Sequence, residues 1–303
     1  MGARHAGYRG RMPEIRGTTW DDFGAVVGLL DKGSRKALGV SDVEPEIVRR
    51  RWQLAGDHLA RDSWVALDDG HLVGHALLER TQEIRLAARD ATIGAALLAH
   101  AERRARERDF AHLALTTVDQ DAPVHETVRN GGFGRDREIL RMWRTLNTEL
   151  PEPRWPDGVT VRTYRDDDGE RVHALLDGAY AGWDPDYVAR SHDDWLTFMT
   201  RHDEFDPDLW FLAEHEDRLV GCALHWRETE GSGWVKDLVV HESERGRGLG
   251  TALLQHAFRA YADRGAARVG LKVDSTNPTG APALYERAGF VTDQRYGIWV
   301  KRL

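Results

Sequence analysis

The amino-acid sequence predicts a mixed α/β fold (α+β, with a mixed sheet) that occurs twice, in tandem domains of which the first is a degenerate copy of the second. Three observations predict this: an internal repeat, short apolar strands that alternate with helical stretches, and a proline-rich segment between the copies. With 303 residues the chain is long enough for two domains that each bury a core.

The repeat consists of segments that match in the same order in the two halves. Residues 94–101 and 250–257 agree at six of eight positions. The other matching pairs are Leu72–Leu77 with Leu219–Leu224, Leu29–Asp31 with Leu175–Asp177, and Gly132–Phe133 with Gly289–Phe290. Between the copies, residues 150–158 carry three prolines, which is typical of a semi-rigid linker. We therefore expect a first domain at residues 13–147, a linker at 148–158 and a second domain at 159–303.

The second copy shows the order of the elements more clearly than the first. In chain order we expect a strand at Val159–Arg162, a helix through Arg171–Tyr180, a hairpin of Leu209–Ala213 with Arg218–Trp226, a strand at Trp234–Val240, a helix from Thr251 to Phe258, a strand at Arg268–Val273, a short helix at Ala281–Ala288 and a last strand at Tyr296–Val300. Hairpins pair antiparallel, whereas neighbouring strands joined by a helix pair parallel, so the sheet is mixed.

A glycine-rich turn, Arg245–Gly250, follows the strand that ends at Val240 and has the pattern R-x-x-G-x-G. Its glycines let backbone N–H groups approach a ligand, and the next helix adds unpaired N–H groups and the positive end of its dipole. The spacing fits neither the dinucleotide fingerprint nor the Walker loop. The turn is therefore either a phosphate site or a plain tight turn.

The corresponding turn of the first copy has Asp90 where the second copy has Gly246, and Thr92 where it has Gly248. Fewer glycines and an added carboxylate do not suit a pyrophosphate, so we expect the first copy to have lost its anion site. The repeat offset also grows from 147 to 156 before this turn, so the first copy lacks nine residues. That gap corresponds to about one strand with part of a turn.

Composition and charge exclude several classes of protein. The net charge of −8 and the lack of long Lys/Arg runs argue against a nucleic-acid binder. The single cysteine, Cys222, rules out an intramolecular disulfide and fits a reducing cytoplasm. No stretch is apolar for long enough to span a bilayer, and no Cys/His cluster has the spacing of a metal site. We expect a cytoplasmic protein that binds neither nucleic acid, membrane nor metal.

The second copy resembles the GNAT superfamily of acetyl-coenzyme A-dependent N-acetyltransferases. It combines the R-x-x-G-x-G turn before a helix with a following strand, Asn277 and the motif L-Y-x-x-x-G-F at Leu284–Phe290. The likeness covers essentially all of the C-terminal domain and extends through the repeat to the first domain. Among tandem members it is most similar to mycothiol synthase and its relatives, which also pair a weakened N-terminal module with an active C-terminal one.

The resemblance implies one acetyl-CoA per chain as acetyl donor and indicates which residues hold it. Backbone amides of the turn would bind the pyrophosphate, at Arg245, Gly246, Arg247, Gly248, Leu249, Gly250 and Thr251. The pantetheine arm would pair with Leu238, Val239 and Val240 as an added strand does. Asn277 would contact the arm, although the segment from Asn277 to Tyr285 is one residue longer than the usual pattern, and Tyr285 would stand beside the sulfur.

Acetyl transfer to an amine needs a base, an oxyanion donor and an acid. An alkyl amine with a pKa of about 10.4 is mostly protonated at neutral pH, so a base or a water chain must deprotonate it. A backbone N–H near Val239 or Val240 suits the oxyanion, and the Tyr285 phenol can protonate the leaving thiolate. The repeat places Val128 opposite Tyr285, so the copy with the altered turn also lacks the hydroxyl.

The identity of the base stays open, because the position at which relatives carry a glutamate corresponds to Trp234. Asp237 is the only carboxylate on that strand, and strict alternation places it on the face of Val235 and Val239, opposite Trp234. Asp237 is either the catalytic base or a structural carboxylate. The remaining candidates are Glu228, His225 and a water chain.

The acceptor is expected to be a primary amine of a small molecule. Aromatic and acidic side chains in Trp183–Tyr187 and His202–Asp208 suit a cationic substrate, or else they are helix caps and solvated turns. Two other functions are alternatives: a non-catalytic acyl-CoA-binding sensor or interaction module, and a protein N-acetyltransferase.

Overall fold

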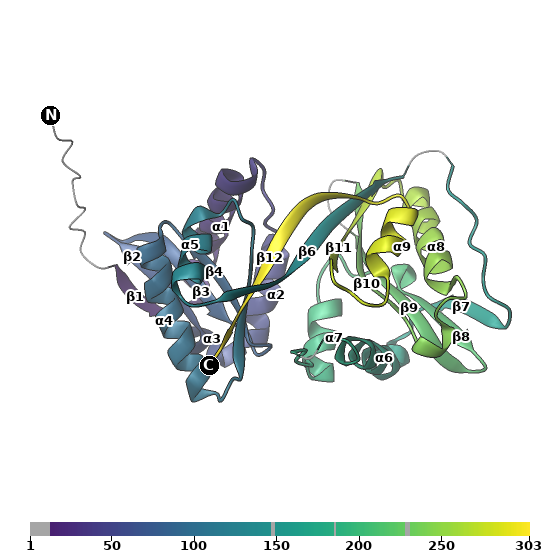
Figure 1. Ribbon diagram of the computed structural model, residues 1–303, viewed down its shortest axis with the longest axis horizontal. Helices are drawn as coiled ribbons and strands as arrows, with labels where there is room; N and C mark the ends of the chain where they lie inside the picture. The colour runs from purple at the N-terminus through teal and green to yellow at the C-terminus, as the bar shows by residue number, and fades with distance from the viewer. Residues whose placement is uncertain (1–12, 147–148, 185, 228–230) are drawn as a thin grey trace. The chain divides into compact units, whose positions relative to one another are not determined.

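The computed structural model describes residues 13–146, 149–184, 186–227 and 231–303. The chain divides into two compact units. One unit comprises the residues up to Gly134 together with Trp299–Leu303, and the other comprises Arg135–Ile298. Each unit contains parallel and antiparallel strand pairs with helices packed on them (Figure 1), which confirms the predicted mixed α/β fold class.

The first unit has the strand order β1-β2-β3-β4-β5, followed by the end of β12. Its strands are β1 (Glu14–Gly17), β2 (Ser63–Asp68), β3 (His71–Leu78), β4 (Glu83–Ala88) and β5 (His112–Thr117). Its helices are α1 (Phe23–Leu38), α2 (Pro45–Ala55), α3 (Leu59–Asp62), α4 (Ala91–Glu107) and α5 (Ala122–Asn130).

The strand β4 shows that the expectation of a missing strand in this copy is wrong. The shortfall in sequence comes partly from strands that are shorter than their counterparts. Most of it comes from the connection that leads into the helix, which is residues 89–90 here and residues 241–248 in the second unit. The first copy has therefore kept its strand and has a shorter turn before the helix.

The second unit has the strand order β12-β6-β11-β10-β9-β8-β7. Its strands are β6 (Gly134–Thr145), β7 (Val159–Thr163), β8 (Phe211–His215), β9 (Arg218–Arg227), β10 (Ser232–Val240), β11 (Arg268–Asp274) and β12 (Val291–Arg302). Its helices are α6 (Gly169–Ala181), α7 (His192–Thr200), α8 (Leu249–Asp263) and α9 (Ala281–Arg287). The helix α7 is an addition to the elements that the sequence predicts.

The boundaries of the compact units differ from those of the expected domains at two strands, β6 and β12. The strand β6 comes from the first half of the sequence, but almost all of it belongs to the second unit, where it pairs antiparallel with β11. The last residues of the chain, which include the end of β12, belong to the first unit. Residues 149–158, the described part of the expected linker, contain no helix or strand.

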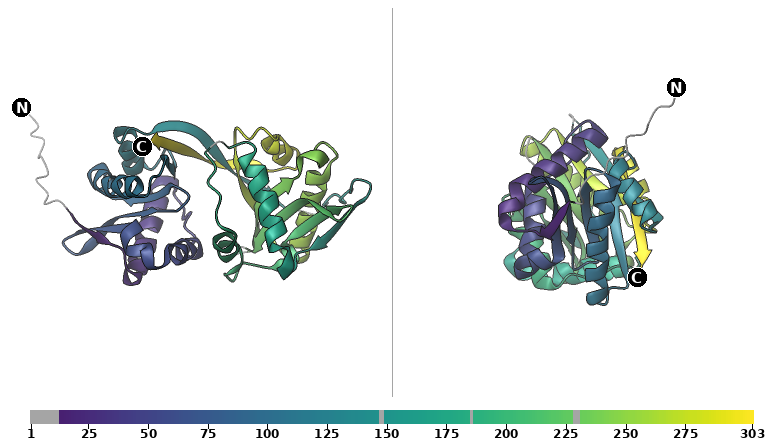
Figure 2. Two further views of the ribbon diagram at one scale, coloured as in Figure 1. Left: turned by 90° about the horizontal axis from the view of Figure 1, so that it is seen from below. Right: turned by 90° about the vertical axis from the view of Figure 1, so that its left-hand side faces the viewer.

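Helices cover both faces of the second unit's sheet. The helices α6 and α7 lie on one face, and α8 and α9 lie on the other (Figures 1 and 2). The spacing of apolar residues along α8 explains its position, because Leu249, Leu253, Ala257 and Tyr261 fall on one side of the helix and are buried. They form a core with strand residues of β8 to β11, among them Val235.

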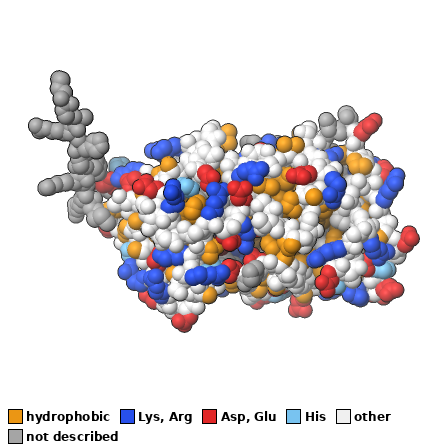
Figure 3. All heavy atoms as spheres, in the orientation of Figure 1, with side chains coloured by type: hydrophobic (Ala, Val, Ile, Leu, Met, Phe, Trp, Pro, Cys, Tyr) orange, Lys and Arg blue, Asp and Glu red, His pale blue; other side chains and the backbone are white. Residues whose placement is uncertain are grey.

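The surface carries acidic and basic side chains interspersed with one another, as Figure 3 shows for one face. Among the helices of the described ranges, none is long and apolar enough to cross a membrane. The same ranges contain no group of three or more His, Cys, Asp or Glu side chains arranged to hold a metal ion.

Candidate active site

The second unit's sheet opens between two of its central strands. The strands β10 and β11 pair in parallel only from Ser232 with Arg268 to Val235 with Leu271. Beyond that point β10 continues to Val240, and β11 continues to Asp274 while it pairs with β6 on its other side. Among the described strands, none therefore pairs with the β10 edge from Lys236 to Val240 on the β11 side. Such an edge can accept an extended ligand in the manner of an added strand.

A β-bulge at Lys236 lies where this opening begins. In the pairing of β10 with β9, Val235 stands opposite His225, but Asp237 stands opposite Leu224, so Lys236 is an extra residue. A bulge of this kind changes the face to which the following side chains point. The strand therefore does not keep the strict alternation that the sequence suggests.

The bulge corrects the expected face of Asp237. Val235 packs into the core beneath α8, whereas the Asp237 carboxylate contacts Tyr180 of α6 on the opposite face. Trp234 stands opposite Trp226, whose ring packs against Phe198 of α7, so Trp234 and Asp237 share the α6/α7 face. Asp237 thus lies on the same face as the position at which the resemblance expects a glutamate.

The glycine-rich turn joins the open edge to α8. Gly246 and Gly248 have φ angles of 77° and 87°, a backbone conformation that side chains other than glycine's rarely adopt. Gly248 is the N-cap of α8 and provides no side chain to cap it, so the first N–H groups of that helix point out of the turn. Gly250 allows close packing, because a Cβ there would lie 3.3 Å from a methyl group of Leu284 on α9. The local structure has the features of an anion site.

The two arginines of the turn contact the protein itself. The Arg247 guanidinium pairs with Glu244 and donates to the Asp157 carbonyl at 3.1 Å. Glu244 also contacts the Nδ1 atom of His215, 3.1 Å away. The Arg245 Nε donates to the Val240 carbonyl at 3.2 Å. These contacts fix the path of the turn between β10 and α8.

The equivalent turn of the first unit is filled by its own side chains. The Asp90 carboxylate caps α4 by accepting a hydrogen bond from the Ile93 N–H at 3.0 Å, and the Arg89 guanidinium contacts Asp68 at 2.7 Å. A carboxylate therefore takes the place where an anion would bind. On β4, Arg85 stands opposite Leu77, the repeat counterpart of Leu224, and so occupies the place that Asp237 has in the second unit.

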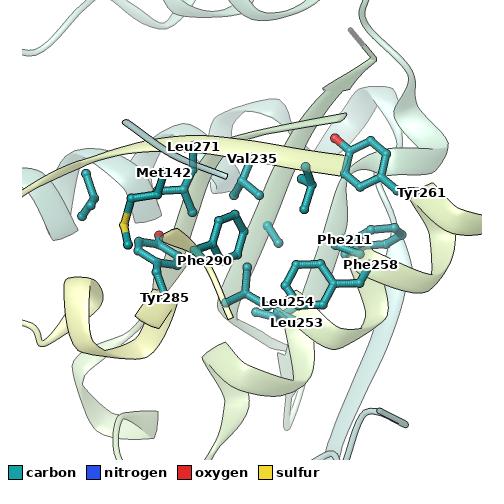
Figure 4. Close-up of a cluster of buried hydrophobic side chains, with 14 of the residues drawn as sticks. Met142, Phe211, Val235, Leu253, Leu254, Phe258, Tyr261, Leu271, Tyr285 and Phe290 are labelled. Atoms are coloured by element: carbon teal, nitrogen blue, oxygen red, sulfur yellow. The ribbon is translucent and has the colours of Figure 1, made fainter. Parts of the chain in front are cut away.

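Tyr285 lies on α9 and is buried, with 6% of its surface exposed. Its ring packs edge-on against Phe290 at a centroid distance of 5.7 Å, within the core that Figure 4 shows. Burial, and secondly the negative charge of Asp237, raise the pKa of the phenol. In the described ranges no hydrogen bond involves the hydroxyl of Tyr285. The first unit has the buried apolar Val128 at the matching position.

Asp237 is a second buried polar residue of this region. Its Oδ1 atom accepts a hydrogen bond from the Tyr180 hydroxyl at 2.5 Å, and its Oδ2 atom lies 3.2 Å from the Nζ atom of Lys236. Burial, and then the charge of Asp237, raise the pKa of Tyr180 well above its ordinary value. The Tyr180 ring stacks on Tyr187, whose hydroxyl donates to Asp177. No sequence motif marks Tyr180, because its partner lies on a strand far along the chain.

Other residues that the sequence suggests have different surroundings. The Asn277 side-chain oxygen accepts hydrogen bonds from the N–H and the hydroxyl of Thr279, in the turn before α9. His225 is fully buried on the α8 face, opposite the face of Asp237, and burial followed by the charge of His256 lowers its pKa to about 3. Glu228 lies outside the described residues.

The two segments that combine acidic and aromatic residues, Trp183–Tyr187 and His202–Asp208, have different surroundings. In the segment from Trp183 to Tyr187, whose Pro185 lies outside the described residues, Asp184 pairs with Arg137 at 2.7 Å and the aromatic rings adjoin Tyr180. In His202–Asp208, the Asp206 side chain caps a short helical turn and Phe205 packs against Trp210. The first segment therefore adjoins the Tyr180–Asp237 pair, and His202 of the second packs on the Trp226 ring that Lys236 contacts.

Comparisons with known proteins agree with this geometry. The Acetyltransferase (GNAT) family matches twice, over residues 32–133 and 169–290. A mycothiol acetyltransferase of Streptomyces coelicolor is 32% identical over 292 residues, which cover 89% of this chain and 88% of that protein. A mycothiol acetyltransferase of Saccharopolyspora erythraea is 36% identical over 197 residues, which cover 63% of this chain and 64% of that protein.

Solved structures show the same fold. A GCN5-related N-acetyltransferase from Sphaerobacter thermophilus superimposes with a TM-score of 0.73 at 28% identity, and 95% of each chain is covered. A tandem GNAT protein from the clavulanic acid biosynthesis pathway gives a TM-score of 0.67 at 19% identity over 95% of this chain and 98% of that one. With a family match in each half and a relative named mycothiol acetyltransferase that matches most of its length, the chain belongs to the GNAT family of N-acetyltransferases and uses an acyl-CoA to acetylate an amine.

Proposed function

We propose that the second unit binds one acetyl-CoA per chain and transfers its acetyl group directly to a primary amine of a small molecule. The observation that carries this proposal is the continuous path from the open β10 edge to the glycine-rich turn. The described part of the first unit has no such path, because Asp90 caps its helix and Val128 replaces the phenol. The relatives named mycothiol acetyltransferase support a small-molecule acceptor.

The residues of this path fit the parts of the cofactor. N–H groups from Gly246 to Thr251, at the N-terminus of α8, would hold the pyrophosphate, and Arg245 and Arg247 would serve its outer oxygens. The unpaired edge at Leu238–Val240 would bind the pantetheine arm, with Asn277 beside it. Acetyl-CoA, when bound, supplies the thioester carbonyl and the thiolate leaving group.

The polar side chains around the opening then have separate roles. Asp237 accepts a proton from the acceptor ammonium, because it is a buried carboxylate that lies on the α6/α7 face at the open β10 edge. A backbone N–H at Val239 or Val240 stabilises the negative charge that develops on the thioester oxygen. Tyr285 gives its proton to the departing sulfur, since its raised pKa keeps the phenol protonated at neutral pH.

Calorimetry with acetyl-CoA tests the site directly. The wild-type chain should show about one site, and Gly248→Glu should abolish it, because a carboxylate side chain at the N-cap would repel the phosphates and would strain a residue with φ of 87°. The matched control is Gly265→Glu at the other end of α8, where φ is 81° and the surrounding space is equally open. Two equal sites, or equal loss of binding in both variants, would contradict the proposal.

A screen of small primary amines for release of free coenzyme A tests the acceptor. Turnover with a small amine supports the assignment. Tight cofactor binding without coenzyme A release from any amine of a broad panel would instead favour the acyl-CoA sensor. Acetylation confined to peptides would favour the protein N-acetyltransferase. The relatives favour neither of these two alternatives.

A further inference from the structure

The bulge at Lys236 turns a lysine toward the same face as Asp237. Its Nζ atom lies 3.2 Å from the Asp237 Oδ2 atom and 5.6 Å from the centre of the Trp226 ring. The lysine side chain is 29% exposed, whereas that of Asp237 is 6% exposed. The ammonium thus reaches the buried carboxylate from the solvent side. Contact with an indole face further stabilises a cation in this position.

An acceptor ammonium must make the same contact in order to lose its proton to Asp237. Oδ1 is already engaged by the Tyr180 hydroxyl, so Oδ2 is the atom left for an ammonium, and Lys236 is beside it. Lys236 also begins the strand edge at which β10 is no longer paired with β11. The protein therefore holds one of its own primary amines at the place where the proposed reaction needs an amine.

The chain offers an internal comparison for this lysine. It has five lysines, at positions 32, 36, 236, 272 and 301. Lys301 resembles Lys236 in ion pairing and exposure. Its Nζ atom lies 2.6 Å from a Glu102 carboxylate oxygen, and its side chain is 24% exposed. Lys301 and Glu102 both belong to the first unit. A difference in reactivity between Lys236 and Lys301 would therefore report on the site and not on exposure or ion pairing.

We propose that Lys236 is a self-acetylation site, at which the protein transfers an acetyl group from acetyl-CoA to its own side chain when no acceptor is present. This inference rests on the proposed function. The Nζ–C bond to the acetyl carbonyl forms and the C–S bond of the thioester breaks. One ammonium proton passes to Asp237 before the attack and a second leaves the nitrogen as the amide forms, while the thiolate takes the Tyr285 proton. Lysine ammonium and acetyl-CoA give N-acetyl-lysine, coenzyme A and one proton.

The modification changes the site in a defined way. It removes the positive charge beside Asp237 and replaces it with a neutral, larger amide. Asp237 then keeps the Tyr180 hydrogen bond but loses its ion-pair partner. Acetylated chains should consequently turn over an external amine more slowly than unmodified ones.

Mass spectrometry of the full-length protein incubated with acetyl-CoA alone tests the inference. We expect about one acetyl group per chain, located at Lys236, and a rate at Lys236 about 10²-fold above that at Lys301, the usual contribution of a positioned base. The variant Lys236→Arg should lose this acetyl group, whereas Lys301→Arg should keep it. Addition of a small amine that the enzyme acetylates should slow the modification, because both amines need the same carboxylate.

Calorimetry on the same samples separates the possible failures. Bound acetyl-CoA with an unmodified Lys236 would overturn the self-acetylation and leave the proposed function intact. Equal acetylation of Lys236 and Lys301 would overturn it as well, because it would show uncatalysed chemistry at accessible lysines. An absence of acetyl-CoA binding would overturn the proposed function together with the inference. Circular dichroism checks that Lys236→Arg is folded.

Discussion

Replacement of Tyr285 by phenylalanine should change the turnover number without changing the stability of the fold. The hydroxyl makes no hydrogen bond within the described ranges, and the ring packs against Phe290 at 5.7 Å. Tyr285→Phe therefore removes no internal hydrogen bond and keeps the packing, so the free energy of unfolding should change by less than about 0.5 kcal/mol. Acetyl-CoA affinity should change less than about threefold, because no binding contact of the ground state is assigned to the hydroxyl.

The turnover number should respond much more strongly. Loss of a positioned acid costs about 10²-fold or more in rate, and a 10²-fold loss corresponds to about 2.7 kcal/mol of transition-state stabilisation. Because the pKa of the Tyr285 phenol is raised, the phenol stays protonated across the neutral range. Deprotonation of this group should therefore produce no alkaline decline in the wild-type rate below a pH of about 10.

The assay combines three measurements on the same preparations: coenzyme A release as a function of acetyl-CoA concentration, calorimetry and thermal unfolding. Tyr261→Phe is the matched control, because the Tyr261 hydroxyl contacts the carbonyls of Trp226 and Trp234 at 2.9 and 3.0 Å and accepts from the Trp234 N–H. That variant should lose about 1–2 kcal/mol of stability. A turnover number for Tyr285→Phe within twofold of the wild type would refute the assigned role.

Three further predictions follow from contacts described above. Tyr180→Phe should lower the free energy of unfolding by about 1.5–3 kcal/mol, the value of a hydrogen bond to a charged group. It should also lower the turnover number more than the affinity for acetyl-CoA, and a normal turnover number would show that the Tyr180 hydroxyl has no role in the reaction. Burial lowers the pKa of His225 to about 3, so this imidazole takes up a proton below pH ~6.5 in the unfolded chain but stays neutral in the folded chain. The free energy of unfolding should therefore fall by about 2 kcal/mol between pH 7.5 and pH 5. Urea unfolding of His225→Leu at both pH values should show that this part of the acid sensitivity is gone, and unchanged sensitivity would contradict it. Asp90→Ala should destabilise the first unit by about 1 kcal/mol through loss of the α4 cap and should leave the number of acetyl-CoA sites at one; a second site in calorimetry would show that the carboxylate alone blocks it.

Local patterns in the sequence were sufficient for the repeat, the mixed sheet and the glycine-rich turn. Each of these depends on residues that are close together in the chain: the three glycines and the following apolar spacing define the turn and α8. The degenerate first copy could be predicted for the same reason, because Asp90 lies directly at the helix N-terminus that it caps.

Features that depend on contacts between distant residues could not be predicted. The extra residue at Lys236 leaves no mark in the hydrophobic pattern of β10, so alternation assigned the wrong face to Asp237. Tyr180 lies 57 residues from the carboxylate that it contacts. The loss of nine residues suggested a missing strand, because length alone does not show whether a strand or a connection has become shorter.

The bulge in β10 has a consequence for how this strand can change by mutation. Side chains alternate between the two faces of the sheet both before and after Lys236, but the extra residue shifts this alternation by one position. Deletion of Lys236 would restore strict alternation while Asp237 stays on the α6/α7 face and Leu238 stays toward the core beneath α8. The strand β4 of the first unit pairs without such a shift. One inserted residue thus adds a lysine beside Asp237 on the α6/α7 face without changing which neighbouring residues pack into the core.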